Sequence, residues 1–500
     1  MPPSLLKSRF LSEALTLIAL TALGIAVSGY HLGIEDQAIY LPAIERQLHP
    51  NLFPHDAELF LAQTRPTLFP QILSAAVRWS HLPLDWVLLQ VQVICIFLVL
   101  WACLRITRRI FDSSAARWAG VALISVMLSL PVAGTALAIA DEYLHPRALA
   151  TALLLFMLVE VINRKLARAI TLFFLAAIIH LQMAFYGLLL AIFFLLPLHW
   201  FIRRPQENSA RQVAASLSVF PISSIFEPPT AAWREAVRSR WQLYLLRWPW
   251  YCWVGIFAPL ALLAWFRRLG SRKQMPRLRE ISARLVAYGI FVFLAAAVLT
   301  IPPRFERLLP YQPMRGFHLL YIFLLLLGGG LIGEFFLKAK PLRWALFFLP
   351  LCLIMAYVQH QVFPASPHIE WPSAQQHNPW LEAFDWAKRN TPEDAYFALD
   401  PNYLARPGED EHGFRALAQR SMMADYVKDS GVALLFPAVA ARWQKEVHAR
   451  DGWPQFRKLE LMRLRADFGV DWVLLERSQP ARAELECPYV NEAVAVCKLE

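Results

Sequence analysis

Two acidic pairs in this chain lie beside apolar runs, where carboxylates are least expected. Glu35 and Asp36 directly follow the first apolar run, and Asp141 and Glu142 lie between two later runs. A carboxylate at an apolar boundary has a raised pKa unless a cation compensates for its lost hydration, and a raised pKa suits a general base. The first pair could instead be solvated loop acids, or acids at the N-terminus of a helix over 37–44. We take both pairs as candidate catalytic residues.

The two acidic pairs could also act together. Asp36, Asp141 and Glu142 could hold a divalent cation, because carboxylate oxygens suit Mg²⁺ or Mn²⁺, and Mn²⁺ would tolerate His145 as a further ligand. Alternatively, one acid is the base and another orients the substrate. Arg147 could contact the substrate, or could merely lie in the first turn of a helix with its guanidinium reaching the membrane surface.

Four more polar residues interrupt apolar runs. His180 and Gln182 lie inside one run, and Arg315 and His318 lie just before or at the start of another. A buried histidine is more often a core residue with satisfied hydrogen bonds, and an arginine at a membrane boundary is often only an anchor. Arg315 could instead bind a lipid phosphate through two parallel hydrogen bonds. These four, with His145 and Arg147, are our candidate substrate-binding residues.

The composition is that of a membrane protein. Hydrophobic residues make up 57% of the 500 residues and charged residues only 17%, and the mean hydropathy is +0.39. Soluble domains are nearer half apolar and a quarter charged. The formal charge of +11 does not indicate nucleic-acid binding: residues 1–359 hold 33 Lys and Arg against 17 Asp and Glu, whereas residues 360–500 hold 16 against 21. We therefore expect a partner that is a lipid bilayer and not a nucleic acid.

Eleven apolar runs predict membrane spans in residues 1–359. Their approximate limits are 11–30, 84–104, 118–139, 148–163, 169–182, 184–202, 213–226, 249–266, 282–302, 316–337 and 342–358. The loops on one side hold 22 basic residues and those on the other side hold 11. The more basic side is expected to be cytoplasmic, which places the N-terminus inside and the C-terminal part outside. A single tilted helix over 169–202 is the alternative to two spans with a break near His180.

Two of the expected outer loops have features of membrane surfaces. The first, over 31–83, includes the stretch 66–82, which suits an amphipathic helix lying on the membrane. The third, over 227–248, is rich in Trp and Arg, which is typical of a segment at the level of the lipid head groups.

The C-terminal part has the pattern of a small soluble domain. A polar linker over 360–379 precedes it, and residues 380–500 alternate between helical and strand patterns, which predicts an α/β fold. The expected elements are helices over 380–389 and 456–468 and strands over 395–399, 470–475 and 493–499. Cys487 and Cys497 could form a disulfide if this domain is extracytoplasmic, although two cysteines carry no spacing signature.

Taken together, these features resemble the GT-C superfamily of multi-pass glycosyltransferases, which includes oligosaccharyltransferase catalytic subunits and mannosyl- and aminoarabinosyl-transferases. The shared features are an acidic first outer loop, a second acidic motif between the third and fourth spans, about eleven spans and an external C-terminal domain. The phrases PWLEAFDWAKRNTPEDAYFALDP, FRALAQRSMMADY and FGVDWVLLE resemble those of bacterial membrane proteins of this type. The tail has no WWD-type motif, which argues against peptide N-glycosylation.

The resemblance implies a fold, a reaction and a location. It implies a polytopic helical bundle in the bacterial inner membrane and transfer of a sugar from a polyprenyl-phosphate donor to an extracytoplasmic lipid, glycan or protein. Asp36 or Glu35 matches the catalytic carboxylate by position, Asp141 and Glu142 match the second acidic motif, and Arg315 matches a contact to the lipid phosphate. The alternative is a non-catalytic scaffold or lipid-binding protein with a degenerate version of this fold. A transporter would need a polar path, and charged residues within the expected spans are scarce.

Overall fold

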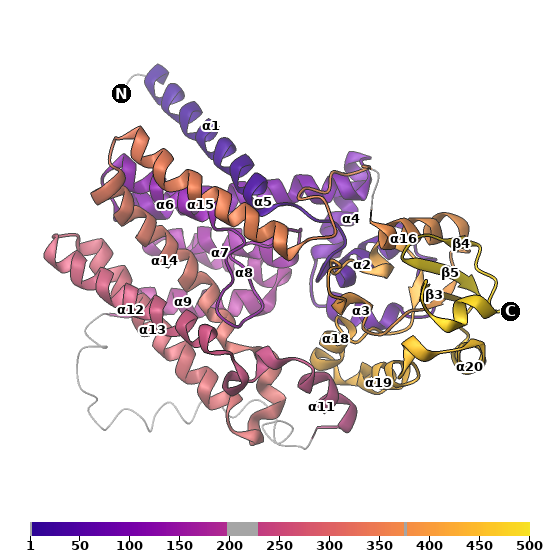
Figure 1. The fold of residues 1–500 in the computed structure, drawn as a ribbon. Coiled ribbons are helices and arrows are strands. Elements are labelled where there is room, and N and C mark those ends of the chain that lie inside the picture. Colours follow the sequence, from indigo (N-terminus) through magenta and orange to yellow (C-terminus); the bar gives the residue numbers. More distant parts are fainter. Residues whose placement is uncertain (1–2, 198–228, 375–377) are drawn as a thin grey trace.

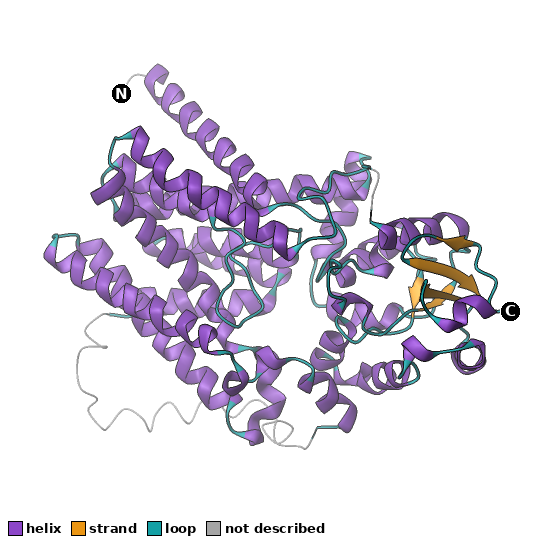
Figure 2. Ribbon diagram, viewed as in Figure 1, coloured by secondary structure: helices purple, strands orange, loops and turns teal. Residues whose placement is uncertain are grey.

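The computed structural model describes residues 3–197, 229–374 and 378–500 of the chain, with side-chain surroundings from Phe10 onward. It is 68% helical. A bundle of helices forms one end of the molecule and a small sheet lies at the other end (Figures 1 and 2).

Six helical segments among the described residues are long and apolar enough to cross a membrane. They are α1 (Pro3–Ser28), α5 (Leu84–Ile110), α12 (Trp250–Arg272), α13 (Pro276–Thr300), α14 (Phe317–Ile332) with the short helical turns that flank it, and α15 (Pro341–Val362). On α15, Leu342, Leu346, Leu349 and Leu353 form a row of exposed leucines three or four residues apart. Such a row is unfavourable in water and suits contact with lipid.

Four shorter helices of the described residues also belong to the bundle. They are α6 (Ser114–Val126), α7 (Pro146–Ile162), α8 (Leu166–Ile179) and α9 (Leu181–Leu195). The break predicted near His180 is confirmed, because α8 ends and α9 begins on either side of this residue. The count of eleven spans is not confirmed, and the expected span over 213–226 lies outside the described residues.

The span predicted over 118–139 is too long. α6 ends at Val126, and residues 127–145 form an irregular segment with a bridge between Pro131 and Ala138. The physical reason is Pro131, which lacks a backbone donor and disfavours helical geometry in the residue before it. The irregular segment carries Asp141 and Glu142 to the N-terminus of α7.

The first loop, residues 31–83, is itself helical. It contains α2 (Gln37–Leu48), α3 (Ala57–Thr64) and α4 (Phe69–Ser80), so the helices predicted over 37–44 and 66–82 are present. This loop and the C-terminal domain share a core: Ile39, Ala43 and Phe60 pack with Val432.

The C-terminal domain is a small α/β fold, as predicted. Its helices are α16 (Pro379–Asn390), α17 (Phe414–Ala418), α18 (Asp429–Leu435), α19 (Ala440–His448) and α20 (Lys458–Phe468). Its strands are β1 (Tyr396–Ala398), β2 (Ser421–Met422), β3 (Trp472–Glu476), β4 (Tyr489–Val490) and β5 (Val494–Lys498). The sheet order is β2-β1-β3-β5-β4; β2, β1 and β3 are parallel, and β5 is antiparallel to both β3 and β4. A disulfide joins Cys487 to Cys497.

The Trp- and Arg-rich segment over 227–248 differs from its prediction. Its helix α11 (Ala231–Arg238) packs against α18 and α19, and both Trp233 and Trp248 are buried. The indole N–H of Trp233 donates to the carbonyl oxygen of Leu434 at 3.0 Å. These two tryptophans therefore contact protein, and a belt at the head groups does not describe them.

Candidate functional site

A cavity of about 1050 Å³ lies where the helical bundle, the first loop and the C-terminal domain meet. One part of its wall is apolar and consists of side chains of α9 and α13, among them Phe185 and Phe291. The polar part of the wall includes five of the predicted site residues and three further cations. These residues are Asp36, His145, His180, Gln182, Arg315, Arg240, Arg307 and Lys428. This volume can enclose a sugar together with the head of a lipid.

Asp36 faces this cavity and does not cap α2, although it occupies the N-cap position. Its carboxylate lies 3.1 Å from Nε2 of His145, and 34% of its side-chain surface is exposed. Burial alone would raise the pKa of Asp36. The hydrogen bond from His145 and the charges of Lys428 and Arg147 outweigh burial and hold the pKa well below its usual value. Asp36 is therefore an ionised carboxylate that opens onto the cavity, and its lowered pKa differs from the raised pKa that the sequence predicted for a base.

His145 fixes the orientation of Asp36. It is the N-cap residue of α7, and its Nδ1 accepts the backbone N–H of Arg147 at 3.1 Å. An accepting Nδ1 carries no proton, so the neutral ring carries its proton on Nε2 and donates it to Asp36. Burial lowers the pKa of His145, which favours this neutral form. One imidazole thus joins the start of α7 to the candidate base.

His180 repeats this arrangement at the start of α9. Its Nδ1 accepts the backbone N–H of Met183 at 3.4 Å, and the ring lines the cavity. The ring centroids of His145 and His180 are 5.9 Å apart. Both histidines therefore cap a helix through Nδ1. The helix does not use Nε2 of either ring, so this nitrogen can contact another partner.

Asp141 and Arg147 form a buried ion pair behind the cavity wall. Nε and Nη2 of Arg147 donate to the two carboxylate oxygens of Asp141 at 3.1 and 2.7 Å. Arg147 is only 4% exposed, so it does not reach the membrane surface as a snorkelling side chain would. Neither residue lines the large cavity. Asp141 therefore positions Arg147, whose backbone holds His145.

The residues proposed as metal ligands are not arranged around one point. Asp36 contacts His145, and both oxygens of Asp141 accept hydrogen bonds from Arg147. Across the described ranges, no three His, Cys, Asp or Glu side chains are grouped so that they could hold a metal ion. The donor set does not fit the expected Mg²⁺ or Mn²⁺, and we derive no step through a cation.

Glu142 and His318 also lie outside the cavity wall. Burial and the neighbouring Asp141 raise the pKa of Glu142 to about 8. Nε2 of His318 is 3.0 Å from the carbonyl oxygen of Ile139, so this buried ring supports the irregular segment before α7. Neither of these two predicted residues therefore faces the cavity.

Arg315 lies at the boundary between the apolar and polar parts of the cavity. Its Nη1 donates to Oε1 of Gln182 at 3.0 Å, and the amide of Gln182 donates to the carbonyl oxygen of Tyr311 at 2.7 Å. Its Nε is buried without a hydrogen-bond partner. Among the ion pairs of the described residues, none involves Arg315. This guanidinium is oriented by a neutral amide and keeps its charge for a ligand.

Three cations of the wall, Arg240, Arg307 and Lys428, were not among the predicted site residues. Lys428, in the C-terminal domain, contacts Glu35 and lies 3.0 Å from Glu411. Arg240 belongs to the Trp- and Arg-rich segment and donates to Val427 and Ser430. Both depend on contacts between distant parts of the chain. The only local signal was the excess of arginine in 227–248, and for Lys428 we find none.

The backbone at the site also departs from ordinary geometry. Glu35 has a φ of 50°, in the left-handed region that non-glycine residues seldom adopt, at a cost of about 1 kcal/mol. This conformation directs the carboxylates of Glu35 and Asp36 to different partners, the first to Lys428 and the second to His145.

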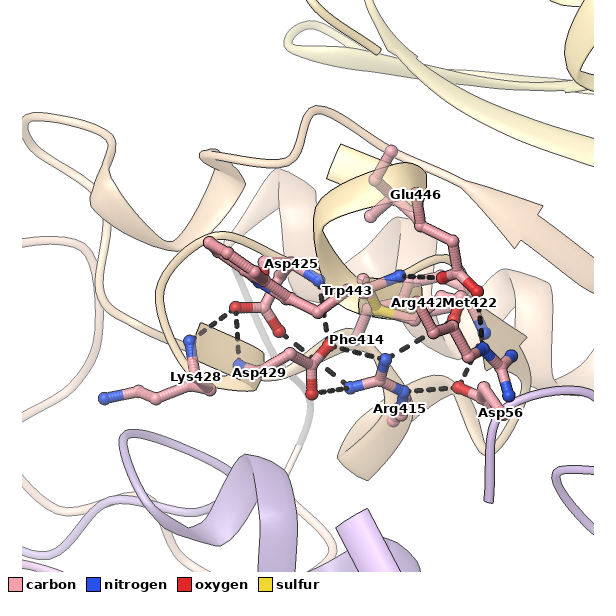
Figure 3. Close-up of polar contacts among 12 residues, drawn as sticks. Asp56, Phe414, Arg415, Met422, Asp425, Lys428, Asp429, Arg442, Trp443 and Glu446 are labelled. Atoms are coloured by element: carbon pink, nitrogen blue, oxygen red, sulfur yellow. Dashed lines mark hydrogen bonds and ion pairs between the residues drawn. The ribbon is translucent and has the colours of Figure 1, made fainter. Parts of the chain in front are cut away.

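A buried ion cluster attaches the C-terminal domain to the first loop (Figure 3). Arg415 contacts Asp56 of the first loop and donates to Asp429 at 2.8 Å, and its Nη1 is 3.9 Å from Asp425. One oxygen of Asp425 accepts the backbone N–H groups of Lys428 and Asp429. The cluster therefore sets the position from which Lys428 reaches the cavity.

Comparison with protein-family models and with curated proteins finds no match for this chain. The functional conclusion therefore rests on the chemistry of the cavity.

Proposed function

We propose that this protein is a membrane glycosyltransferase that moves a sugar from a polyprenyl-phosphate donor to an acceptor hydroxyl. The observation that carries the proposal is that Asp36 and Arg315 line one cavity whose remaining wall, along α9 and α13, is apolar. A polyprenyl-phosphate sugar has the matching parts: an apolar chain, an anionic phosphate and a sugar. Six helical segments able to cross a membrane, and a disulfide in the C-terminal domain, support an inner-membrane protein whose cavity opens on the extracytoplasmic side.

Asp36 is the general base of the proposed reaction. It accepts the proton of the acceptor hydroxyl while that oxygen forms a bond to the anomeric carbon. The bond between the anomeric carbon and the phosphate oxygen breaks, and the configuration of the sugar inverts. His145, through its Nε2–H, holds the accepting carboxylate in one orientation.

Arg315 stabilises the departing phosphate. The guanidinium can donate two parallel hydrogen bonds to a phosphate, and charge that develops on the leaving group is stabilised most by a cation fixed in advance. Gln182 provides this fixation. Phe185 and Phe291, which are 58% and 46% exposed, supply the apolar surface for the first part of the lipid chain.

Asp36→Asn tests the proposal directly. We expect transfer from a defined polyprenyl-phosphate sugar to fall about a thousandfold in purified protein, because an amide cannot accept the proton. The matched control is Glu58→Gln, which neutralises an exposed acid of the same loop that does not line the cavity. The donor and acceptor are first identified from the mass shift of cell-envelope glycans and lipids after deletion of the gene.

The alternative, a lipid-binding scaffold, predicts a different outcome. Such a protein would bind polyprenyl phosphate through Arg315 but would support no transfer with any donor, and Asp36→Asn would leave the envelope glycans unchanged. A fully active Asp36→Asn protein would also refute the role of this carboxylate.

A further inference from the structure

Among the described residues, Arg240 is one of three arginines on the cavity wall, with Arg307 and Arg315, and is contributed by the segment that follows α11. Its Nη2 donates to the carbonyl oxygen of Val427 and to Oγ of Ser430, the latter at 3.3 Å. Its Nε is buried and has no hydrogen-bond partner. The guanidinium is thus held by two neutral oxygens, and its buried Nε–H donor has no partner.

The residue of the C-terminal domain that faces the Arg240 guanidinium is a glycine, Gly431. A Cβ atom on Gly431 would lie 2.6 Å from Nη2 and 3.0 Å from Cζ of Arg240, closer than atoms tolerate. Only glycine leaves this space open. The first turn of α18 therefore accommodates Arg240 at one defined place on the wall.

The charge of Arg240 is not neutralised by an ion pair. Within the part of the chain that the structure describes, no carboxylate lies within ion-pair distance of Arg240 or Arg315, whereas Lys428 has both Glu35 and Glu411. Burial lowers the pKa of Arg240 against the opposing effect of Asp36, the carboxylate with the largest influence on it. A partly buried cation without a counterion is costly unless a ligand supplies the missing charge.

We propose that the cavity binds two phosphate-type anions at once, one at Arg315 beside the apolar wall and one at Arg240 beside the C-terminal domain. The proposal rests on the proposed function and specifies its substrates. The second anion is either the second phosphate of a diphosphate-linked donor or an acidic group of the acceptor. Both sources present the same chemistry to Arg240: oxygens of a doubly or singly charged anion that accept from Nε and the free guanidinium hydrogens.

Binding to the full-length protein in nanodiscs tests the proposal in two arms. The first arm compares farnesyl phosphate with farnesyl diphosphate, and the second titrates inorganic phosphate after saturation with farnesyl phosphate. In the first arm we expect the wild type to bind farnesyl diphosphate about tenfold or more tightly than farnesyl phosphate. In the second arm we expect the wild type to bind free phosphate about tenfold or more tightly than the Arg240→Gln variant does. A gain in the first arm identifies a diphosphate donor, and a gain in the second arm alone identifies an acidic acceptor.

Three variants assign the effect to its residue. Arg240→Gln should remove the gain and leave farnesyl phosphate binding unchanged, whereas Arg315→Gln should weaken farnesyl phosphate itself about tenfold. Gly431→Ala keeps both charges but displaces the Arg240 guanidinium, and it should reduce the gain in the same direction. Arg238→Gln is the matched control, because Arg238 is an exposed arginine of the same segment that does not line this cavity.

The outcomes separate this inference from the proposed function. Wild-type protein that shows no gain in either arm, or an Arg240→Gln protein that retains the gain, overturns the two-anion proposal even if sugar transfer depends on Asp36. Conversely, a gain that depends on Arg240 in a protein that transfers no sugar supports the two anion sites and refutes the glycosyltransferase.

Discussion

Two arginines of this molecule show opposite ways of placing a guanidinium inside a protein. Arg415 is surrounded by Asp56, Asp425 and Asp429 (Figure 3), whereas Arg315 is held by one neutral amide. The first cation is more than neutralised by its own chain, so it holds two parts of the fold together. The charge of Arg315 is not neutralised by the chain, and its guanidinium faces a cavity. The difference indicates which buried charge serves stability and which serves a ligand.

The largest expected effect tests the structural half of this comparison. Arg415→Met keeps the approximate volume but leaves three buried carboxylates without a counterion, so we expect a loss of about 3–5 kcal/mol in the stability of the attachment. Thermal unfolding in detergent and protease sensitivity of the C-terminal domain measure it. An Arg415→Met protein as stable as the wild type would show that the cluster does not hold the domain.

A smaller effect, on activity alone, is expected at the other arginine. Arg315→Gln should lower kcat/KM for transfer between tenfold and a hundredfold, roughly 1.4–2.7 kcal/mol, because the phosphate loses a charge-assisted hydrogen bond. The melting temperature should stay the same or rise, since an unneutralised cation is removed. Loss of stability in parallel with activity would erase the contrast with Arg415.

The smallest effect concerns pH. Burial and the neighbouring Asp429 raise the pKa of Asp425 to about 7, above its ordinary value of 3.8. The folded state therefore binds a proton more tightly than the unfolded state, and stability falls as the pH rises from about 4 to about 7. Asp425→Asn should remove this fall, so that between pH 5 and pH 8 the variant loses less stability than the wild type. Thermal unfolding of both proteins at pH 5 and pH 8 provides the measurement, and parallel pH dependence of the two proteins would contradict it.

Local patterns predicted the elements of this fold better than their extent. The break at His180 and the strands β1, β3 and β5 of the C-terminal domain were predicted from residue order alone, because they depend on neighbours in the sequence, whereas β2 and β4 were not predicted. The end of α6 was missed because hydropathy continues past Val126 while Pro131 interrupts the backbone. Hydropathy averaged over a run of apolar residues does not detect that Pro131 lacks a backbone N–H donor.

The site was predicted in part, for a similar reason. Asp36 and Arg315 were expected at one outer surface, and both line the cavity. Lys428 was missed because its partner Glu35 is 393 residues away in the sequence. Asp141 was expected in the site on the basis of its acidity and position, but Arg147, only six residues later, takes both of its oxygens. Acidity marks where a carboxylate is unusual, and only the three-dimensional neighbours decide whether it remains available.

The two histidine caps restrict what the imidazoles can do. Since Nδ1 of His145 and of His180 is bound to the backbone of the helix it begins, a ring flip would place a carbon where the helix needs an acceptor. In the neutral form each ring therefore uses its lone pair on the helix and presents only Nε2–H to other partners. Neither can pass a proton from one side of the ring to the other without opening the first turn of its helix. Proton transfer in this cavity therefore involves the Asp36 carboxylate and does not pass through the imidazole rings.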